Sequence, residues 1–185
     1  MIFDAKFSSD DQYIVSGSWD ATLRVWETAT GKEKQYINLN NNSPYVVGFT
    51  PKDLYLMSAN LDYKAGLWEI DAGEQFRNII GHTHLISDFD FSPDGKQMVT
   101  GSWDGKAKIW NILSGMLTNK FSEHNGAVYA VTWDPKGRFI ASGSNDRTIR
   151  LWNAESGEII KTLNGHSNSI TDIQITPDGK HLLSC

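Results

Sequence analysis

Four tryptophans stand at a constant spacing of 42 residues in this 185-residue chain: Trp26, Trp68, Trp110 and Trp152. Other residue types keep the same register, namely Pro51, Pro93, Pro135 and Pro177, and likewise Asp20, Asp62, Asp104 and Asp146. A period of about 40–45 residues with a recurring Trp indicates a tandem repeat of one small supersecondary unit. We therefore expect most of the chemically suggestive residues to serve the architecture.

Each unit divides into four short apolar segments separated by turn residues. In the fourth unit the expected strands are Ala127–Trp133, Arg138–Gly143, Thr148–Trp152 and Glu158–Leu163. A single sheet of this size cannot bury both of its faces alone. Stacking such sheets around an axis covers them, so the repeat predicts the blades of a propeller.

The third unit shows the motif of the repeat in full. It contains Gly81-His82, Ser92-Pro93-Asp94-Gly95, Thr100-Gly101-Ser102, Asp104 and Ile109-Trp110. Read end to end, this unit resembles one repeat of the WD family, and the resemblance covers essentially the whole chain. The defining dipeptide itself is altered, since it is Trp-Glu in two units and Trp-Asn in two. The resemblance implies an all-β, WD-repeat-like β-propeller.

Chain length predicts an incomplete propeller, because a closed one of this family typically has about six to eight blades and 185 residues at a 42-residue period make about 4.4 units. The expected organisation is a single propeller segment over residues 1–185, with four blades and half of a fifth. Its repeat units are approximately 1–39, 40–81, 82–123, 124–165 and the partial unit 166–185. Truncation of a longer protein, or completion by a second chain, would explain this length.

Composition narrows the class of partner and the compartment. The net charge of −5 and the absence of a basic run disfavour nucleic acid. A single cysteine, Cys185, fits a reducing compartment. There is no signal-peptide pattern and no apolar stretch of membrane-spanning length. We expect a cytoplasmic or nuclear protein without a membrane partner.

A hydroxyl, an imidazole and a carboxylate recur with each Trp, and in isolation they suggest nucleophilic catalysis. Because the set is copied in several units, we interpret it as structural. The resemblance implies a hydrogen-bonded network that orders the turn and satisfies the buried indole. Its expected members are Ser16, Asp20, Trp26, Ser58, Asp62, Trp68, His82, Thr100, Asp104, Trp110, His124, Ser142, Asp146, Trp152 and His166. Asn40 replaces the His in the second unit, so the second blade should be the less rigid one.

No other motif indicates catalysis. His82 and His84 could form a metal pair, but no third ligand is suggested nearby. The Gly-Lys pairs lack the phosphate-loop pattern, and no GxSxG elbow occurs. We therefore expect no enzyme activity, no catalytic residue, no cofactor, no metal and no small-molecule substrate.

The resemblance places outward-facing residues beside the turn Asp and three residues after the His. The candidate partner-binding residues are Trp19, Leu61, Tyr63, Leu85, Trp103, Asn145 and Arg147. Exposed aromatic side chains are typical binding hot spots, but Trp19 and Trp103 could instead pack over neighbouring loops. Arg147 is the only arginine among these positions, and recognition of a phosphate needs an arginine cluster, so phosphopeptides are disfavoured as partners. An apolar or helical peptide, or a folded protein surface, is the expected partner.

Three aspartates share one position on alternate first strands: Asp4, Asp88 and Asp172. If first strands line the central channel, these carboxylates could bind a basic side chain. The alternative is that each accepts a hydrogen bond from a neighbouring backbone N–H.

These features predict a noncatalytic protein–protein interaction scaffold that binds peptide or protein partners of a larger complex on the narrow face. The alternative is a regulatory or sensor propeller segment of a larger multidomain enzyme or signalling protein.

Overall fold

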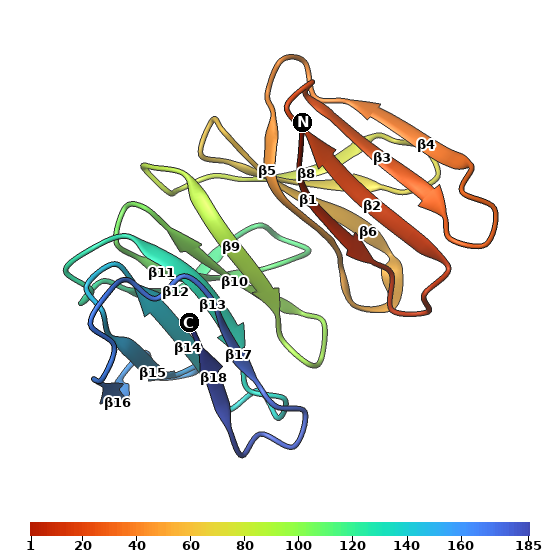
Figure 1. The fold of residues 1–185 in the computed structure, drawn as a ribbon. Coiled ribbons are helices and arrows are strands. Elements are labelled where there is room, and N and C mark those ends of the chain that lie inside the picture. The colour runs from red at the N-terminus through yellow and green to blue at the C-terminus, as the bar shows by residue number, and fades with distance from the viewer. The chain divides into compact units, whose positions relative to one another are not determined.

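The computed structural model describes all residues, 1–185, and the chain forms two compact units, Met1–Ile86 and Ser87–Cys185 (Figure 1). Each unit is built from four-stranded antiparallel sheets in which consecutive strands are neighbours. The expected fold class is confirmed: four such sheets and one two-stranded sheet are present, with a single 3-10 turn at Pro51–Asp53. The proposed repeat boundaries stay a prediction.

The first unit holds the first two blades. Blade one consists of β1 (Ile2–Phe7), β2 (Tyr13–Ser18), β3 (Thr22–Glu27) and β4 (Glu33–Asn38). Blade two consists of β5 (Pro44–Phe49), β6 (Tyr55–Asn60), β7 (Ala65–Glu69) and β8 (Gln75–Ile79). Between the two sheets lies a core with Val15, Leu23, Val25, Ile37, Leu39, Val47, Leu56 and Trp68.

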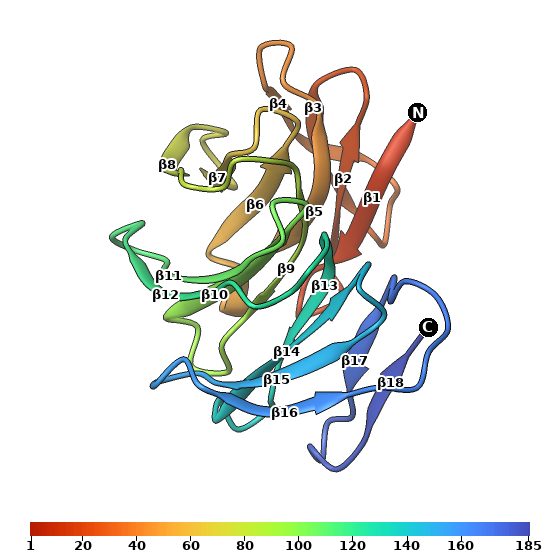
Figure 2. The ribbon, with the colours of Figure 1, turned by 90° about the vertical axis from the view of Figure 1, so that its left-hand side faces the viewer.

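The second unit holds blades three and four and the partial fifth. Blade three consists of β9 (Ile86–Phe91), β10 (Gln97–Ser102), β11 (Ala107–Asn111) and β12 (Leu117–Phe121). Blade four consists of β13 (Val128–Trp133), β14 (Phe139–Ser144), β15 (Ile149–Asn153) and β16 (Ile159–Leu163). Figure 2 shows the hairpin of β17 (Ile173–Ile175) and β18 (Leu182–Ser184) beside blade four.

The strands of blade four lie within one residue of their expected bounds at either end, because turn chemistry fixes where they stop. Gly137 closes the first turn with a φ of +72°, in the left-handed region that glycine adopts without strain. The second turn follows Asp146, and Arg147 takes a φ of +70° there. Ala21, Tyr63 and Gly105 hold the same left-handed position in the other blades.

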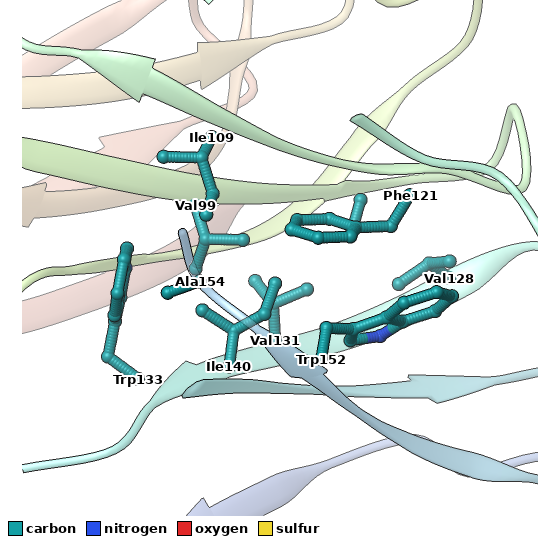
Figure 3. Packing of buried hydrophobic residues seen from close by; sticks show 10 residues of the cluster. Val99, Ile109, Phe121, Val128, Val131, Trp133, Ile140, Trp152 and Ala154 are labelled. Carbon is teal, nitrogen blue, oxygen red and sulfur yellow. The ribbon is translucent and has the colours of Figure 1, made fainter. Parts of the chain in front are cut away.

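The core between blades three and four repeats the core of the first unit at equivalent positions. Phe121 and Trp152 face each other with ring centres 5.0 Å apart, and Val99, Val131 and Ile140 surround them (Figure 3). All five side chains are at most 3% exposed. Within each unit, neighbouring sheets thus cover one another's apolar faces, as the stacking of blades requires.

Candidate functional site

Blade four contains the complete structural network around Trp152. The indole Nε1–H of Trp152 donates to Ser142 Oγ at 2.8 Å. The imidazole of His124 lies 2.8 Å from Ser142 Oγ through Nε2 and 2.8 Å from Asp146 Oδ2 through Nδ1. Asp146 also accepts hydrogen bonds from Thr148. The four side chains therefore form one continuous chain of hydrogen bonds from the core to the turn.

The protonation states of His124 and Asp146 determine which groups donate and which accept along this chain of hydrogen bonds. Burial lowers the pKa of His124, even though Asp146 opposes the shift. Burial alone would raise the pKa of Asp146, but hydrogen bonds from Thr148 and His124 outweigh it and hold this pKa well below its usual range. A neutral imidazole then donates from Nδ1 to the carboxylate and accepts the Ser142 hydroxyl at Nε2.

The same arrangement of Ser, His and Asp activates nucleophiles in hydrolases. Here Ser142 is 0% exposed and its oxygen accepts the indole N–H of Trp152. A substrate carbonyl has no route to a hydroxyl buried in this way. The geometry therefore supports ordering of the β14–β15 turn rather than nucleophilic attack.

The hydrogen bond from the indole to a hydroxyl group recurs in the other three complete blades. Trp26 donates to Ser16 at 2.9 Å, Trp68 to Ser58 at 3.0 Å and Trp110 to Thr100 at 2.8 Å. In the partial fifth blade His166 Nε2 lies 2.8 Å from Ser184 Oγ. The turn carboxylates Asp20, Asp62 and Asp104 each hydrogen-bond a neighbour two residues further along the chain. His82 is buried in the first unit.

Blade two lacks the imidazole. Asn40 stands in its place, is exposed and has a φ of +52°. It is one of the residues that line a polar cavity of about 310 Å³. Trp68 borders this cavity and is 9% exposed, whereas Trp152 is fully buried. The sequence shows that the second repeat lacks the His. The cavity is visible only in the structure, because it depends on the packing around Trp68.

The expected partner-binding residues are distributed over both units. Trp19 and Tyr63 of the first unit are 58% and 40% exposed, and Trp103 of the second unit is 43% exposed. Asn145 and Arg147 are exposed, and Leu61 is half-buried. Leu85 departs from the expectation of an outward-facing residue: it lies directly before β9 and is 7% exposed.

Further aromatic residues contact these tryptophans and were missed by the sequence reasoning. The Trp19 ring centre lies 5.4 Å from Phe3, which lies 5.5 Å from Tyr45. In the second unit Trp103 contacts Tyr129 edge-on at 6.0 Å. Tyr45 and Tyr129 stand 84 residues apart, twice the repeat, and that spacing was the available signal.

The first-strand aspartates accept backbone hydrogen bonds from the next blade. Asp4 Oδ2 accepts the N–H of Val47 at 3.0 Å, and Asp88 Oδ2 accepts that of Val131 at 2.8 Å. These contacts match the backbone alternative for both residues. Burial raises the pKa of Asp88 to about 7.

No group of three His, Cys, Asp or Glu side chains in the described residues is arranged to hold a metal ion. His84 accepts the N–H of Leu85 at Nδ1 and stacks on Tyr63 at 5.2 Å. The structure contains no helix long and apolar enough to cross a membrane.

Four-stranded antiparallel sheets packed face to face, each with a hydrogen-bonded Trp on its third strand, define a β-propeller repeat protein. The family model described as "WD domain, G-beta repeat" matches residues 2–27, 73–111, 115–153 and 157–185. The chain belongs to the WD-repeat family. The unmatched residues 28–72 include β5, β6 and β7 of blade two, where the network is incomplete.

One similar curated protein is the "Small ribosomal subunit protein RACK1" of Drosophila melanogaster, 58% identical over 31 residues. The alignment covers 17% of this chain and 10% of that relative. The chain thus matches about a tenth of the relative's length.

Proposed function

We propose that this chain is a protein-interaction scaffold that binds peptide or protein partners through exposed aromatic residues at its Asp turns. The observation that carries the proposal is the fixed yet exposed Trp19. Its backbone N–H donates to Met1 O at 2.8 Å, and its carbonyl accepts the Ser43 hydroxyl at 2.9 Å. A rigid Trp loses little conformational entropy on binding, which favours its use as an anchor.

The second unit presents an equivalent anchor. Trp103 occupies the same turn position and rests edge-on against Tyr129, so its ring is oriented before a partner arrives. One repeat further along the chain, Asn145 and Arg147 supply polar groups at the corresponding turn of blade four. An aromatic centre with a polar surround is the usual composition of a protein interface.

Apolar or amphipathic partners fit these residues better than phosphopeptides. Phosphate recognition needs clustered arginines, whereas the turn positions carry Arg147 alone. We therefore assign the partner as a helical or apolar peptide segment, or a folded protein surface of the same character.

Alanine substitution of the two anchors tests the proposal. Trp19→Ala and Trp103→Ala should each weaken partner capture about tenfold or more, a hot-spot effect, while thermal stability changes little. Leu113→Ala is the matched control, because Leu113 is 63% exposed in the β11–β12 turn, away from the Asp turns. Full retention of partners by both Trp variants, at unchanged stability, would contradict the proposal.

A further inference from the structure

Blade two contains a polar cavity among its loops. It has a volume of about 310 Å³ and lies among the loop before β5, the β6–β7 turn and the outer strand β8. Its lining includes Asn40, Asn60, Asp62, Lys64, Trp68 and Asn78. This volume is at the lower end of the range for small-ligand pockets, roughly 300–1,000 Å³.

Comparison with blade four shows which groups are missing. In the 42-residue register Asn40 stands for His124, and Gly66 stands for Arg150. In blade four the Arg150 guanidinium carbon lies 6.0 Å from the Trp152 ring centre. A Cβ on Gly66 would lie 2.7 Å from Trp68 Nε1, so the indole occupies the space that a side chain would need. Blade two therefore lacks both an imidazole and a cation beside its Trp.

One buried acceptor among the lining residues has no hydrogen-bond partner. Asn60 is 4% exposed, and its Oδ1 makes no hydrogen bond. At the equivalent position of blade four, Ser144 Oγ accepts the backbone N–H of the turn residue Asp146. In blade two the N–H of Asp62 donates instead to Asn42 Oδ1 at 3.2 Å. Leaving a buried acceptor unpaired costs free energy, so a ligand that donates to it gains affinity.

We propose that this cavity binds a guanidinium group, presented by an arginine side chain of a peptide or by free arginine. The guanidinium is a planar cation with several N–H donors, and it stacks favourably on indole. Asn60 Oδ1 and the Asp62 carboxylate supply acceptors, and Trp68 supplies the aromatic surface. The ligand thus replaces the two groups that blade two lacks. This site goes beyond the aromatic anchors of the proposed function.

Lys64 competes for the same carboxylate. Its Nζ lies 3.1 Å from Asp62 Oδ2, and the two side chains are 43% and 36% exposed. Ion pairs with this exposure are weak, so the lysine can turn to solvent when a guanidinium enters. Lys64→Ala should accordingly lower the Kd for a guanidinium about threefold, the factor that such a pair is worth.

Binding can be measured on the full chain by NMR titration with methylguanidinium. We expect the NMR signals of the Trp68 indole N–H and of the Asn60 side-chain amide to shift saturably. The signal of the Trp152 indole N–H should not shift. Methylammonium, which has the same charge without the planar fork, should shift these signals far less. Equal shifts with both cations, or none at Trp68, would overturn the proposal.

A gain-of-structure variant provides the second test. Asn40→His puts an imidazole at the register position of His124, and His tolerates the left-handed backbone of Asn40 better than most residues. It should raise Tm and abolish the methylguanidinium shift at Trp68. Asn41→His is the matched control, because Asn41 has a φ of +68° and is absent from the cavity lining. An undiminished shift in Asn40→His, with the control unchanged, would overturn the proposal.

Two further probes separate the sources of the guanidinium. Acetyl-Gly-Arg-Gly-amide carries an arginine side chain without free termini, and free L-arginine carries charged ones. Tighter binding of the peptide assigns the site to a partner's arginine, and tighter binding of free arginine assigns it to the small molecule. Failure of both to shift Trp68 would overturn the proposal.

Discussion

The two inter-blade cores are built from the same positions but are filled differently. Between blades three and four, the Phe121 ring packs at a tilt against Trp152, and His124 completes the hydrogen-bond network. Between blades one and two, Ile37 takes the place of Phe121, and Asn40 that of His124. The apolar framework is kept in both, so packing of the sheets does not depend on the polar network. The network instead fills the end of the core that lies nearest the Asp turn.

The largest expected difference between the two cores concerns their tryptophans. Trp152→Ala should lower the free energy of unfolding by about 3–5 kcal/mol, the usual cost of a large buried aromatic residue. Trp68→Ala should cost about 1–2 kcal/mol less, because a cavity already borders its indole. Urea unfolding followed by fluorescence measures both losses. Equal losses would mean that the two cores are packed equally well.

Loss of the imidazole itself should produce the next largest difference. His124→Ala leaves Ser142 and Asp146 without a shared partner and should cost about 2–3 kcal/mol. Asn40→Ala changes an exposed side chain and should cost about 1 kcal/mol at most, mainly because alanine tolerates a φ of +52° less well than asparagine. Thermal melts of the two variants compare the blades directly. A large loss in Asn40→Ala would show that blade two has a network of its own.

Asp88, which joins blade three to blade four, should make the stability of the fold depend on pH. The folded-state pKa of Asp88, about 7, lies above its ordinary value of 3.8, and burial is the main cause, with Asp90 and Asp172 adding to it. The protonated carboxyl group therefore favours folding. Its contribution is fully present below about pH 4 and is lost as the pH rises through about 7.

Replacement of the carboxyl group isolates this effect. Asp88→Asn keeps an oxygen for the Val131 N–H but cannot ionise. Its stability relative to the wild type should increase between pH 5 and pH 8, by more than about 1 kcal/mol. Differential scanning calorimetry at several pH values gives the comparison. A constant difference between the two proteins would show that Asp88 does not titrate in this range.

The smallest expected effect concerns the turn position after the Asp. Arg147→Gly should stabilise the chain by about 0.5–1 kcal/mol, since glycine adopts a φ near +70° without strain. Tyr63→Gly should gain less, because it also removes the ring that stacks on His84. Chemical denaturation resolves such differences when the variants are measured in parallel. A loss of stability in Arg147→Gly would indicate that its side chain contributes to the turn.

Much of the fold could be predicted from the 42-residue period, because strand order, turn residues and the Trp position repeat with it. The absence of a His at Asn40 was also visible. The cavity could not be predicted from the sequence, because it depends on how the Trp68 indole lies over Gly66 and on the orientation of the Asn60 amide. Leu85 was misplaced because register fixes a position in the loop but not whether its side chain turns inward.

The hydrogen bonds that the backbone N–H groups of Val47 and Val131 donate to Asp4 and Asp88 also affect how the molecule opens. Each amide is held by a side chain of the preceding blade. Exchange of these two amide hydrogens with solvent therefore requires neighbouring blades to part, even while each sheet stays intact. Their exchange rates, compared with those of amides within the same sheets, would distinguish separation of blades from unfolding of a blade.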